Sequence, residues 1–252
     1  MTYLDGFSGY GGFHLAFEQA GWHFDKCFFS EIDKHAIANY TNNFPKSIYA
    51  GSINTICTTN IITELDLFTF GWPCQDNSIA GNRRGQREGT RSGLLYEAVN
   101  IINKFKPRNF VAENVAGLLS VNEAVDIVES FKILSYLNES CPQYDIEMQL
   151  LNTRWFLPQN RERLFFIGHL RGSGSKQIFP FGGENWQHTK LEIQPKPVAD
   201  CLTKRGAGEM HSGMQLLRLE GQYRTVTPTE CERLQGLPLD WTKYGNYAGG
   251  GY

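Results

Sequence analysis

The chain has no long apolar run. None of its segments approaches the roughly 20 consecutive apolar residues that a membrane-spanning helix requires. Met1 is followed almost at once by the apolar residues of a first expected strand, which leaves no room for a signal peptide at this end. These absences argue against a membrane partner and favour a cytoplasmic location.

Cysteine is also scarce. The 252 residues include six cysteines, and no two of them have the C-x-x-C spacing of a zinc or redox site. They are too few for a disulfide scaffold in a chain of this length. We therefore expect no metal site and a reducing environment. The cysteines are Cys27, Cys57, Cys74, Cys141, Cys201 and Cys231.

The chain lacks the positive net charge that is common in DNA-binding proteins, because 24 Lys and Arg face 26 Asp and Glu and give a formal net charge of −2. The charges are unevenly distributed. Residues 1–70 and 101–150 carry the acidic excess, whereas residues 151–223 are rich in lysine and arginine. A basic face on an acidic body is typical of local phosphate contact, so nucleic acid is a candidate partner.

Short apolar runs alternate with helical patterns from Thr2 to Gly168, and no internal repeat interrupts them. The runs predict strands at Leu4–Asp5, Cys27–Ser30, Leu67–Phe70, Asn109–Ala112 and Leu164–Gly168. Helical spacing is found near residues 13–20, 33–42, 92–104 and 122–139. This alternation predicts an α/β fold, a doubly wound and mostly parallel sheet covered by helices on both faces.

A cysteine follows directly after one of these strands, in Gly71-Trp72-Pro73-Cys74. Open α/β sheets keep their chemistry at the carboxyl ends of their strands. A thiol there is a strong nucleophile if nearby N–H groups or arginines lower its pKa. An arginine-rich loop follows, with Arg83, Arg84, Arg87 and Arg91. On its own this pattern is more typical of an inert buried cysteine.

A glycine-rich turn, Phe7–Gly12, follows the first strand and leads into a helical pattern. Glycines let the backbone approach a ligand closely, and a helix start offers N–H groups to an anionic group. Glu31 ends the next strand, at about the 20-residue separation at which an acidic side chain meets a ribose hydroxyl. Together they favour an adenosine-containing cofactor.

Two further sets of charged residues flank strands. Glu113 follows Asn109–Ala112 at the sheet edge expected for Cys74, where a carboxyl group with a raised pKa can donate a proton. Arg161 and Arg163 precede or begin the strand at Leu164, and alternation places both on one face. An ordinary salt bridge for Glu113 and a solvated edge for the arginines are the commoner explanations.

In this order the segments resemble the cytosine-5 DNA methyltransferase family, of the type found in bacterial and phage restriction-modification systems. The matching segments are Phe7–Gly12, Ser30–Asp33, Gly71–Gln75, Glu113–Val115, Gln159–Arg163, and Arg224–Pro228 with Glu230, Arg233–Gly236 and Pro238. Several ordered matches are far more specific than any one of them. The resemblance implies the fold of S-adenosylmethionine-dependent methyltransferases.

The resemblance also implies a reaction on a cytosine flipped out of double-stranded DNA. Cys74 would add to carbon 6, so that carbon 5 can take a methyl group from S-adenosylmethionine. Glu113 would bind the ring nitrogen N3 and the exocyclic amine. Arg163, helped by Arg161, would hold the O2 oxygen. The arginine-rich loop at residues 76–91 would close on the DNA backbone.

The family's cofactor residues carry over to matching positions. Glu31 would bind the ribose hydroxyls and Ile32 would pack on adenine, while the glycine turn lines the methionine and adenosine parts. Ser52 stands where the family usually has aspartate, so it would offer adenine an uncharged acceptor. The full expected set is Phe7, Gly9, Gly11, Glu31, Ile32, Ser52, Ile53 and Pro73.

The expected division is a catalytic domain at residues 1–168, a short irregular target recognition region at 169–223, and a return segment at 224–252. Lys204, Arg205 and His211 are the candidates for reading the DNA sequence, with an ordinary glycine-rich loop as the alternative. The family normally continues after Asp240-Trp241 with a Gly-Asn-x-Val segment and a helix. Here Gly245-Asn246 matches only the first two residues of that segment. We therefore expect a C-terminally truncated chain, a second polypeptide that completes the cofactor site, or weak cofactor binding.

Two other functions fit the same residues. The branch of the family that methylates tRNA shares residues of the Cys74 and Glu113 type, so RNA is an alternative substrate. A non-catalytic DNA-binding remnant would also explain the missing C-terminal segment.

Overall fold

The computed structural model describes residues 1–72, 94–119, 125–137, 139, 141–179, 216–219, 222–225 and 227–245. Within these residues, seven strands form one sheet and two more form a hairpin. The sheet strands are β1 (Thr2–Gly6), β2 (Lys26–Ser30), β3 (Ile48–Tyr49), β4 (Leu67–Gly71), β5 (Asn109–Val115), β6 (Tyr144–Asn152) and β7 (Glu162–Leu170). The helices are α1 (Gly12–Gln19), α2 (Lys34–Asn43), α3 (Leu94–Phe105), α4 (Val125–Tyr136) and α5 (Pro228–Leu234).

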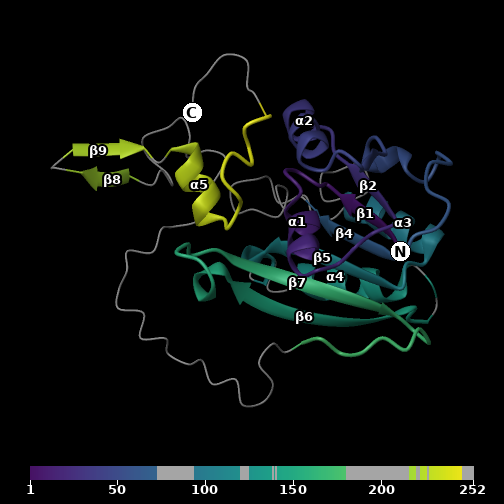
Figure 1. Ribbon diagram of the computed structural model, residues 1–252. Coiled ribbons are helices and arrows are strands. Elements are labelled where there is room, and N and C mark those ends of the chain that lie inside the picture. Colours follow the sequence, from purple (N-terminus) through teal and green to yellow (C-terminus); the bar gives the residue numbers. More distant parts are fainter. Residues whose placement is uncertain are drawn as a thin grey trace.

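The sheet has the strand order β3-β2-β1-β4-β5-β7-β6 (Figure 1). Strands β1 to β5 pair in parallel, whereas β7 runs antiparallel between β5 and β6. The predicted mostly parallel sheet is therefore confirmed. The expected strand–helix alternation is wrong at its end, because β6 and β7 are joined by a loop with one short 3-10 helix (Thr153–Trp155) and without an α-helix.

The β6 strand was not expected from the sequence. Its residues, Tyr-Asp-Ile-Glu-Met-Gln-Leu-Leu-Asn, alternate between partly buried and exposed positions along much of the strand. Such a pattern is typical of an antiparallel edge strand with one solvated face. The residues lack the continuous apolar run that identified the inner strands.

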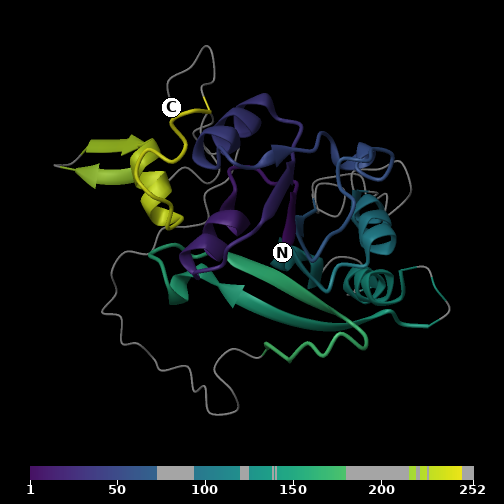
Figure 2. The ribbon, with the colours of Figure 1, turned by 45° about the vertical axis from the view of Figure 1, so that its right-hand side comes forward.

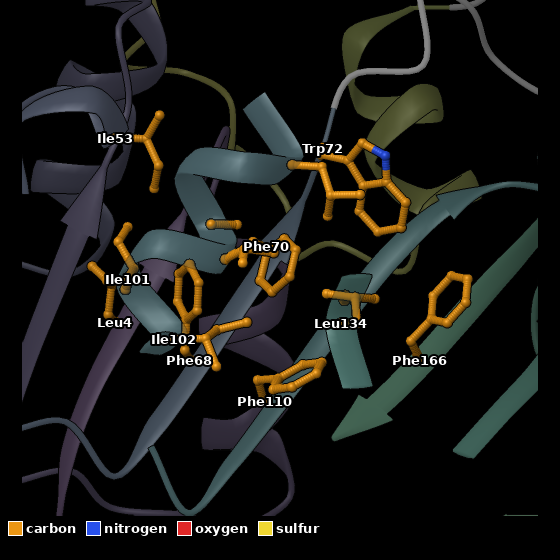
Figure 3. Packing of buried hydrophobic residues seen from close by; sticks show 14 of the residues in the cluster. Leu4, Ile53, Phe68, Phe70, Trp72, Ile101, Ile102, Phe110, Leu134 and Phe166 are labelled. Atoms are coloured by element: carbon orange, nitrogen blue, oxygen red, sulfur yellow. The ribbon is translucent and has the colours of Figure 1, made fainter. Parts of the chain in front are cut away.

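Helices cover both faces of the sheet, as the doubly wound prediction requires (Figure 2). Successive residues of each strand point to opposite faces. In β1, Leu4 belongs to the main core under α3 and α4, which contribute Ile101 and Leu134. On the other face, Phe29 of β2 packs with Tyr40 of α2, their rings stacked at 4.1 Å. Figure 3 shows the main core from close by.

Gly168 of β7 illustrates how tightly the sheet packs. It lies opposite Phe110 of β5, and a Cβ added at Gly168 would come within 2.1 Å of the Phe110 ring. The ring therefore lies across the glycine, and any side chain would displace it. Protein interiors tolerate such overpacking poorly.

The return segment follows the hairpin of β8 (Leu216–Leu219) and β9 (Gln222–Thr225). The expected boundary at residues 223/224 falls inside β9. Helix α5 starts with a capping box, in which Thr227 accepts from the Glu230 N–H and the Glu230 carboxylate accepts from the Thr227 N–H. Figure 1 places the hairpin and α5 on the side of the molecule away from α3 and α4. Among the described residues, no helix is both long and apolar enough to cross a membrane.

Candidate active site

The sheet register brings the predicted site segments to one edge. Gly6 at the end of β1 is level with Ser30 and with Phe70, and Gly71 at the end of β4 is level with Glu113. The glycine turn, Glu31 and Glu113 therefore start from the same edge of the sheet. This is the edge at which open α/β sheets bind ligands.

The glycine turn has an unusual backbone. Phe7, Gly9 and Gly11 all have positive φ angles, of 53°, 52° and 81°. This region is strained for a residue with a side chain such as Phe7. Gly11 also has no room for a side chain, since a Cβ there would lie 2.5 Å from the Phe44 ring. The turn is held by hydrogen bonds from the Ser8 N–H to the Ser30 carbonyl and from the Gly11 N–H to the Ser8 carbonyl.

Glu31 ties the turn to the start of the β2–α2 loop. Its Oε2 accepts from the Gly9 N–H at 2.9 Å, and its Oε1 accepts from the N–H groups of Ile32 and Asp33 at 2.7 and 3.0 Å. Beside it, Ile32 is 80% exposed. The arrangement places a carboxylate and an apolar surface next to each other at the sheet edge.

Ser52 and Ile53 have different environments. Ser52 is half-buried and starts a short 3-10 helix, and its carbonyl accepts from Thr55. Ile53 is buried in the main core, and its Cδ1 would lie 3.1 Å from a Cβ at Gly6. The side chain of Ile53 therefore supports the sheet edge from within the core.

A buried polar network lies beneath the glycine turn, and sequence reasoning did not identify it. Asp5 of β1 is fully buried and accepts from the hydroxyls of Thr69 at 3.0 Å and Tyr40 at 3.4 Å. The backbone N–H of His14, in the first turn of α1, also donates to it. Burial nevertheless raises the pKa of Asp5 to about 8. The one signal in the sequence is an aspartate inside an apolar strand.

His14 extends this network. Its Nδ1 lies 2.9 Å from the Tyr40 hydroxyl, and its ring stacks on Phe44 at 3.8 Å. Burial lowers the pKa of His14 to about 4, so the imidazole is neutral at physiological pH. The network thus anchors the start of α1 to β1 and α2 without a net positive charge.

Glu113 and Arg163 form an ion pair on neighbouring strands. Arg163 Nε lies 2.7 Å from Glu113 Oε1, with side-chain exposures of 16% and 25%. The antiparallel register of β5 and β7 brings them together, because Arg163 is level with Val115. Arg163 Nη1 also donates to the Glu162 carbonyl, which fixes the guanidinium plane. The salt bridge expected as the commoner environment of Glu113 is present, and it lies at the predicted site.

Arg161 is held in a different way. The buried Asn152 at the end of β6 accepts from the N–H groups of Arg154 and Arg161, at 3.0 and 3.3 Å. The Arg161 carbonyl in turn accepts from the Thr153 N–H at 3.0 Å. Asn152 therefore organises the β6–β7 loop next to Arg163, a role that the sequence pattern did not predict.

The chain leaves β4 through Trp72, which is buried and whose carbonyl accepts from Asn114 Nδ2 at 3.2 Å. Asn114 directly follows Glu113, so the start of the Pro-Cys segment is tied to the strand that carries the carboxylate. Pro73, Cys74, the arginine-rich loop, and Lys204, Arg205 and His211 lie outside the described residues. Among the described residues, no group of three or more His, Cys, Asp and Glu is placed to hold a metal ion.

A family model with the description C-5 cytosine-specific DNA methylase matches residues 1–206. The chain belongs to this family. Its predicted membership, which rested on six ordered segments, is confirmed.

Several methyltransferases are similar to this chain. The orphan methyltransferase M.Rho11sI of Bacillus phage rho11s is 36% identical over 167 residues, which cover 64% of this chain and 31% of that protein. The type II methyltransferase M.HpaII of Haemophilus parainfluenzae is 36% identical over 177 residues, 69% of this chain and 47% of the relative. The chain thus spans less than half the length of these relatives.

Other relatives match over nearly the whole chain. M.DsaV of Dactylococcopsis salina is 27% identical over 300 residues, covering 98% of this chain and 82% of that protein. The crystal structure of S. pombe Dnmt2 methyltransferase superposes with a TM-score of 0.68 at 19% identity, covering 99% of this chain and 90% of the other. The similarity to Dnmt2 shows that the two chains share a fold, and the methyltransferase fold predicted from the sequence is confirmed.

Proposed function

We propose that this chain is a DNA cytosine-5 methyltransferase that transfers a methyl group from S-adenosylmethionine to carbon 5 of a cytosine in double-stranded DNA. Membership of the family supports the proposal. The observation that carries it is the Glu113–Arg163 pair, which lies at the sheet edge shared by the glycine turn and by the strand leading to Cys74.

The residues at this edge fit an adenosine-containing cofactor. A Cβ added at Gly9 or Gly12 would meet no atom of the described residues within 4 Å, so these glycines face open space. Phe7, Gly9 and Gly11 line the methionine and adenosine, Glu31 binds the ribose, Ile32 packs on adenine, and Ser52 accepts from its amine. S-adenosylmethionine supplies an electrophilic methyl group. Pro73 and Ile53 complete the expected set.

The chain's own residues prepare the cytosine. The Cys74 thiolate forms a bond to carbon 6, and the electron pair of the 5,6 double bond moves to carbon 5, which becomes nucleophilic. After methylation, loss of the carbon-5 proton restores the double bond as the carbon–sulfur bond breaks. The thiolate is regenerated, so Cys74 acts as a covalent catalyst.

Glu113 and Arg163 stabilise the charge that develops in the ring. The Glu113 carboxyl group binds N3 and the exocyclic amine, while the Arg163 guanidinium, supported by Arg161, holds O2. A guanidinium has five donors in a fixed plane, so it can bind the carboxylate and a base oxygen together. Preorganised charges of this kind are a large term in catalysis.

Double-stranded DNA is the proposed partner, with the target base flipped out of the stack at a cost of a few kcal/mol. Arginines of the loop at residues 76–91 and of the basic segment 151–223 contribute phosphate contacts. Lys204, Arg205 and His211 are the proposed reading residues of the recognition region at 169–223.

Methyl transfer from labelled S-adenosylmethionine to duplex DNA and to tRNA, measured side by side, tests the proposal. We expect label in DNA, and bisulfite sequencing should then locate it at cytosine. Label in tRNA but not in DNA would replace the proposal by the RNA-directed alternative. DNA binding without any bound cofactor would identify a non-catalytic remnant.

A further inference from the structure

The return segment reaches the glycine turn from far away in the sequence. The indole Nε1 of Trp241 donates to the carbonyl of Tyr10 at 2.9 Å, across a separation of 231 residues. Tyr10 lies between Gly9 and Gly11, the two glycines of the turn with positive φ. The Trp241 ring also meets Phe44 edge-on, with centroids 5.4 Å apart. The turn is therefore contacted from outside as well as from the sheet.

Trp241 is placed by a buried carboxylate. Glu232 of α5 is 3% exposed, its Oε1 accepts from the N–H and the hydroxyl of Thr242, both at 2.7 Å, and its Oε2 accepts from the Asp240 N–H at 3.0 Å. Asp240 has a φ of 59°, a strained value for a residue with a side chain. The carboxylate thus binds Asp240 and Thr242, the residues on both sides of Trp241.

The same segment is anchored on α2. Asn43 Nδ2 donates to the Trp241 carbonyl at 2.9 Å. A Cβ added at Gly245 would lie 3.4 Å from both the His35 carbonyl oxygen and the Tyr10 ring, so the end of the segment touches the turn and the start of α2 together. These two elements flank Glu31 and Ile32. The segment therefore joins both sides of the proposed cofactor site.

We propose that Glu232 and Trp241 are positioning residues that hold the glycine turn in its ligand-binding conformation. This inference rests on the proposed function and assigns it two further residues. A turn with three positive φ angles persists when its surroundings over-determine it. Because the turn is already ordered before the ligand binds, less conformational entropy is lost on binding. Glu232 and Trp241 act on the cofactor through the Tyr10 carbonyl.

Two variants test the proposal. Trp241→Phe keeps an aromatic ring against Phe44 but removes the N–H donor. Glu232→Gln replaces one carboxylate oxygen by an NH₂ group, which cannot accept from the N–H groups of Asp240 and Thr242 or from the Thr242 hydroxyl. Glu147→Gln is the control. Glu147 lies on β6, at the opposite edge of the sheet from β3, and also accepts from two backbone N–H groups, of Ile178 and Phe179. All three are tested in the full chain, together with the double variant of Trp241 and Glu232.

Three quantities are measured: amide hydrogen exchange at residues 8–12, affinity for S-adenosylmethionine by calorimetry, and the thermal midpoint. Trp241→Phe and Glu232→Gln should each speed exchange in the turn and weaken affinity by about 3- to 10-fold, the change that one net hydrogen bond produces. The loss of affinity in the double variant should be smaller than the sum of the two single losses, because both substitutions act through the same contact of Trp241 with Tyr10. Glu147→Gln should lower the thermal midpoint and leave the turn unchanged.

Unchanged exchange at residues 8–12 in Trp241→Phe would overturn the proposal, as would an equal effect of Glu147→Gln. Faster exchange with unaltered cofactor affinity would overturn the link to binding. A wild-type chain that binds no S-adenosylmethionine would refute the proposed function, and the exchange data would still decide whether Trp241 holds the turn. If Glu232→Gln fails to fold, Trp241→Phe decides alone.

Discussion

Glu113 Oε1 and Arg163 Nε lie 2.7 Å apart, joined across the antiparallel strands β5 and β7. The pair is partly shielded from water, so its charge-assisted hydrogen bond is stronger than that of an exposed ion pair. Each residue is predicted to orient the other toward the flipped base. Replacing either partner should therefore impair catalysis more than folding.

Arg163→Lys should lower the rate of methyl transfer by roughly 10²-fold, the cost of removing one preorganised donor. A lysine keeps the charge but loses the planar donor set that contacts Glu113 and O2. Arg171→Lys is the control, because the Arg171–Asp145 pair is exposed. Single-turnover rates of the two variants are compared, and equal rates would place Arg163 in an ordinary salt bridge.

Glu113→Gln should lower methyl transfer by on the order of 10²-fold or more, as for other positioned proton-transfer groups. Affinity for duplex DNA should change little, since the carboxyl group acts on the ring and not on phosphates. The measurement is a rate at saturating DNA together with a binding titration. A rate like that of the wild type would assign Glu113 a structural role.

Asp5→Asn should change the pH dependence of stability. Because burial raises the pKa of Asp5 from 3.8 to about 8, the folded chain keeps a proton that the unfolded chain loses above pH 4. The stability from this proton is complete below pH 4 and is lost as pH rises through 8. Over this window the free energy of unfolding falls by up to about 1.4 kcal/mol per pH unit.

The asparagine does not titrate, so the stability of Asp5→Asn relative to the wild type should increase from pH 5 to 8. The groups that face Asp5 are the Thr69 and Tyr40 hydroxyls and, at longer range, Glu31. His14 has an opposite effect, since its lowered pKa costs stability as pH falls below 6.5, but it is present in both proteins. Denaturant unfolding at several pH values measures the difference, and a constant difference would show that Asp5 is ionised throughout.

Gly168→Ala should destabilise the chain by about 1–3 kcal/mol, because the added methyl group meets the Phe110 ring and forces the strands to shift. Gly12→Ala is the control, since a Cβ at the start of α1 meets no described atom within 4 Å. Denaturant midpoints compare the two variants. A loss of stability at Gly12 as large as that at Gly168 would contradict the packing argument.

The sequence predicted those parts of the fold that depend on local patterns. Helical spacing placed α1 and α2 within one residue of their observed bounds, and apolar runs located β1, β2, β4, β5 and β7. The strand β6 was missed because an edge strand with alternating polarity carries a weaker signal than a buried apolar run. The two-residue strand β3 is too short to produce a recognisable sequence pattern.

Contacts between distant residues could not be predicted in this way. The Asp5 network joins β1 to Thr69 and Tyr40, which are 64 and 35 residues away. The Trp241–Tyr10 contact depends on how the return segment packs on α2. A buried Asp5 in an apolar strand is a visible signal, but its partners follow from the tertiary arrangement. The packing of Ile53 in the main core also depends on the tertiary arrangement, because an isoleucine fits a core and a ligand surface equally well.

The covalent adduct of Cys74 is the most direct test of the proposed reaction. Incubation with S-adenosylmethionine and duplex DNA that carries 5-fluorocytosine should trap the wild-type chain in a complex that survives denaturation, because fluorine cannot leave as a proton does. The complex should form with the wild type and be lost in Cys74→Ser. A complex that still forms with Cys74→Ser, or none with a wild-type chain that methylates ordinary DNA, would contradict the proposed reaction.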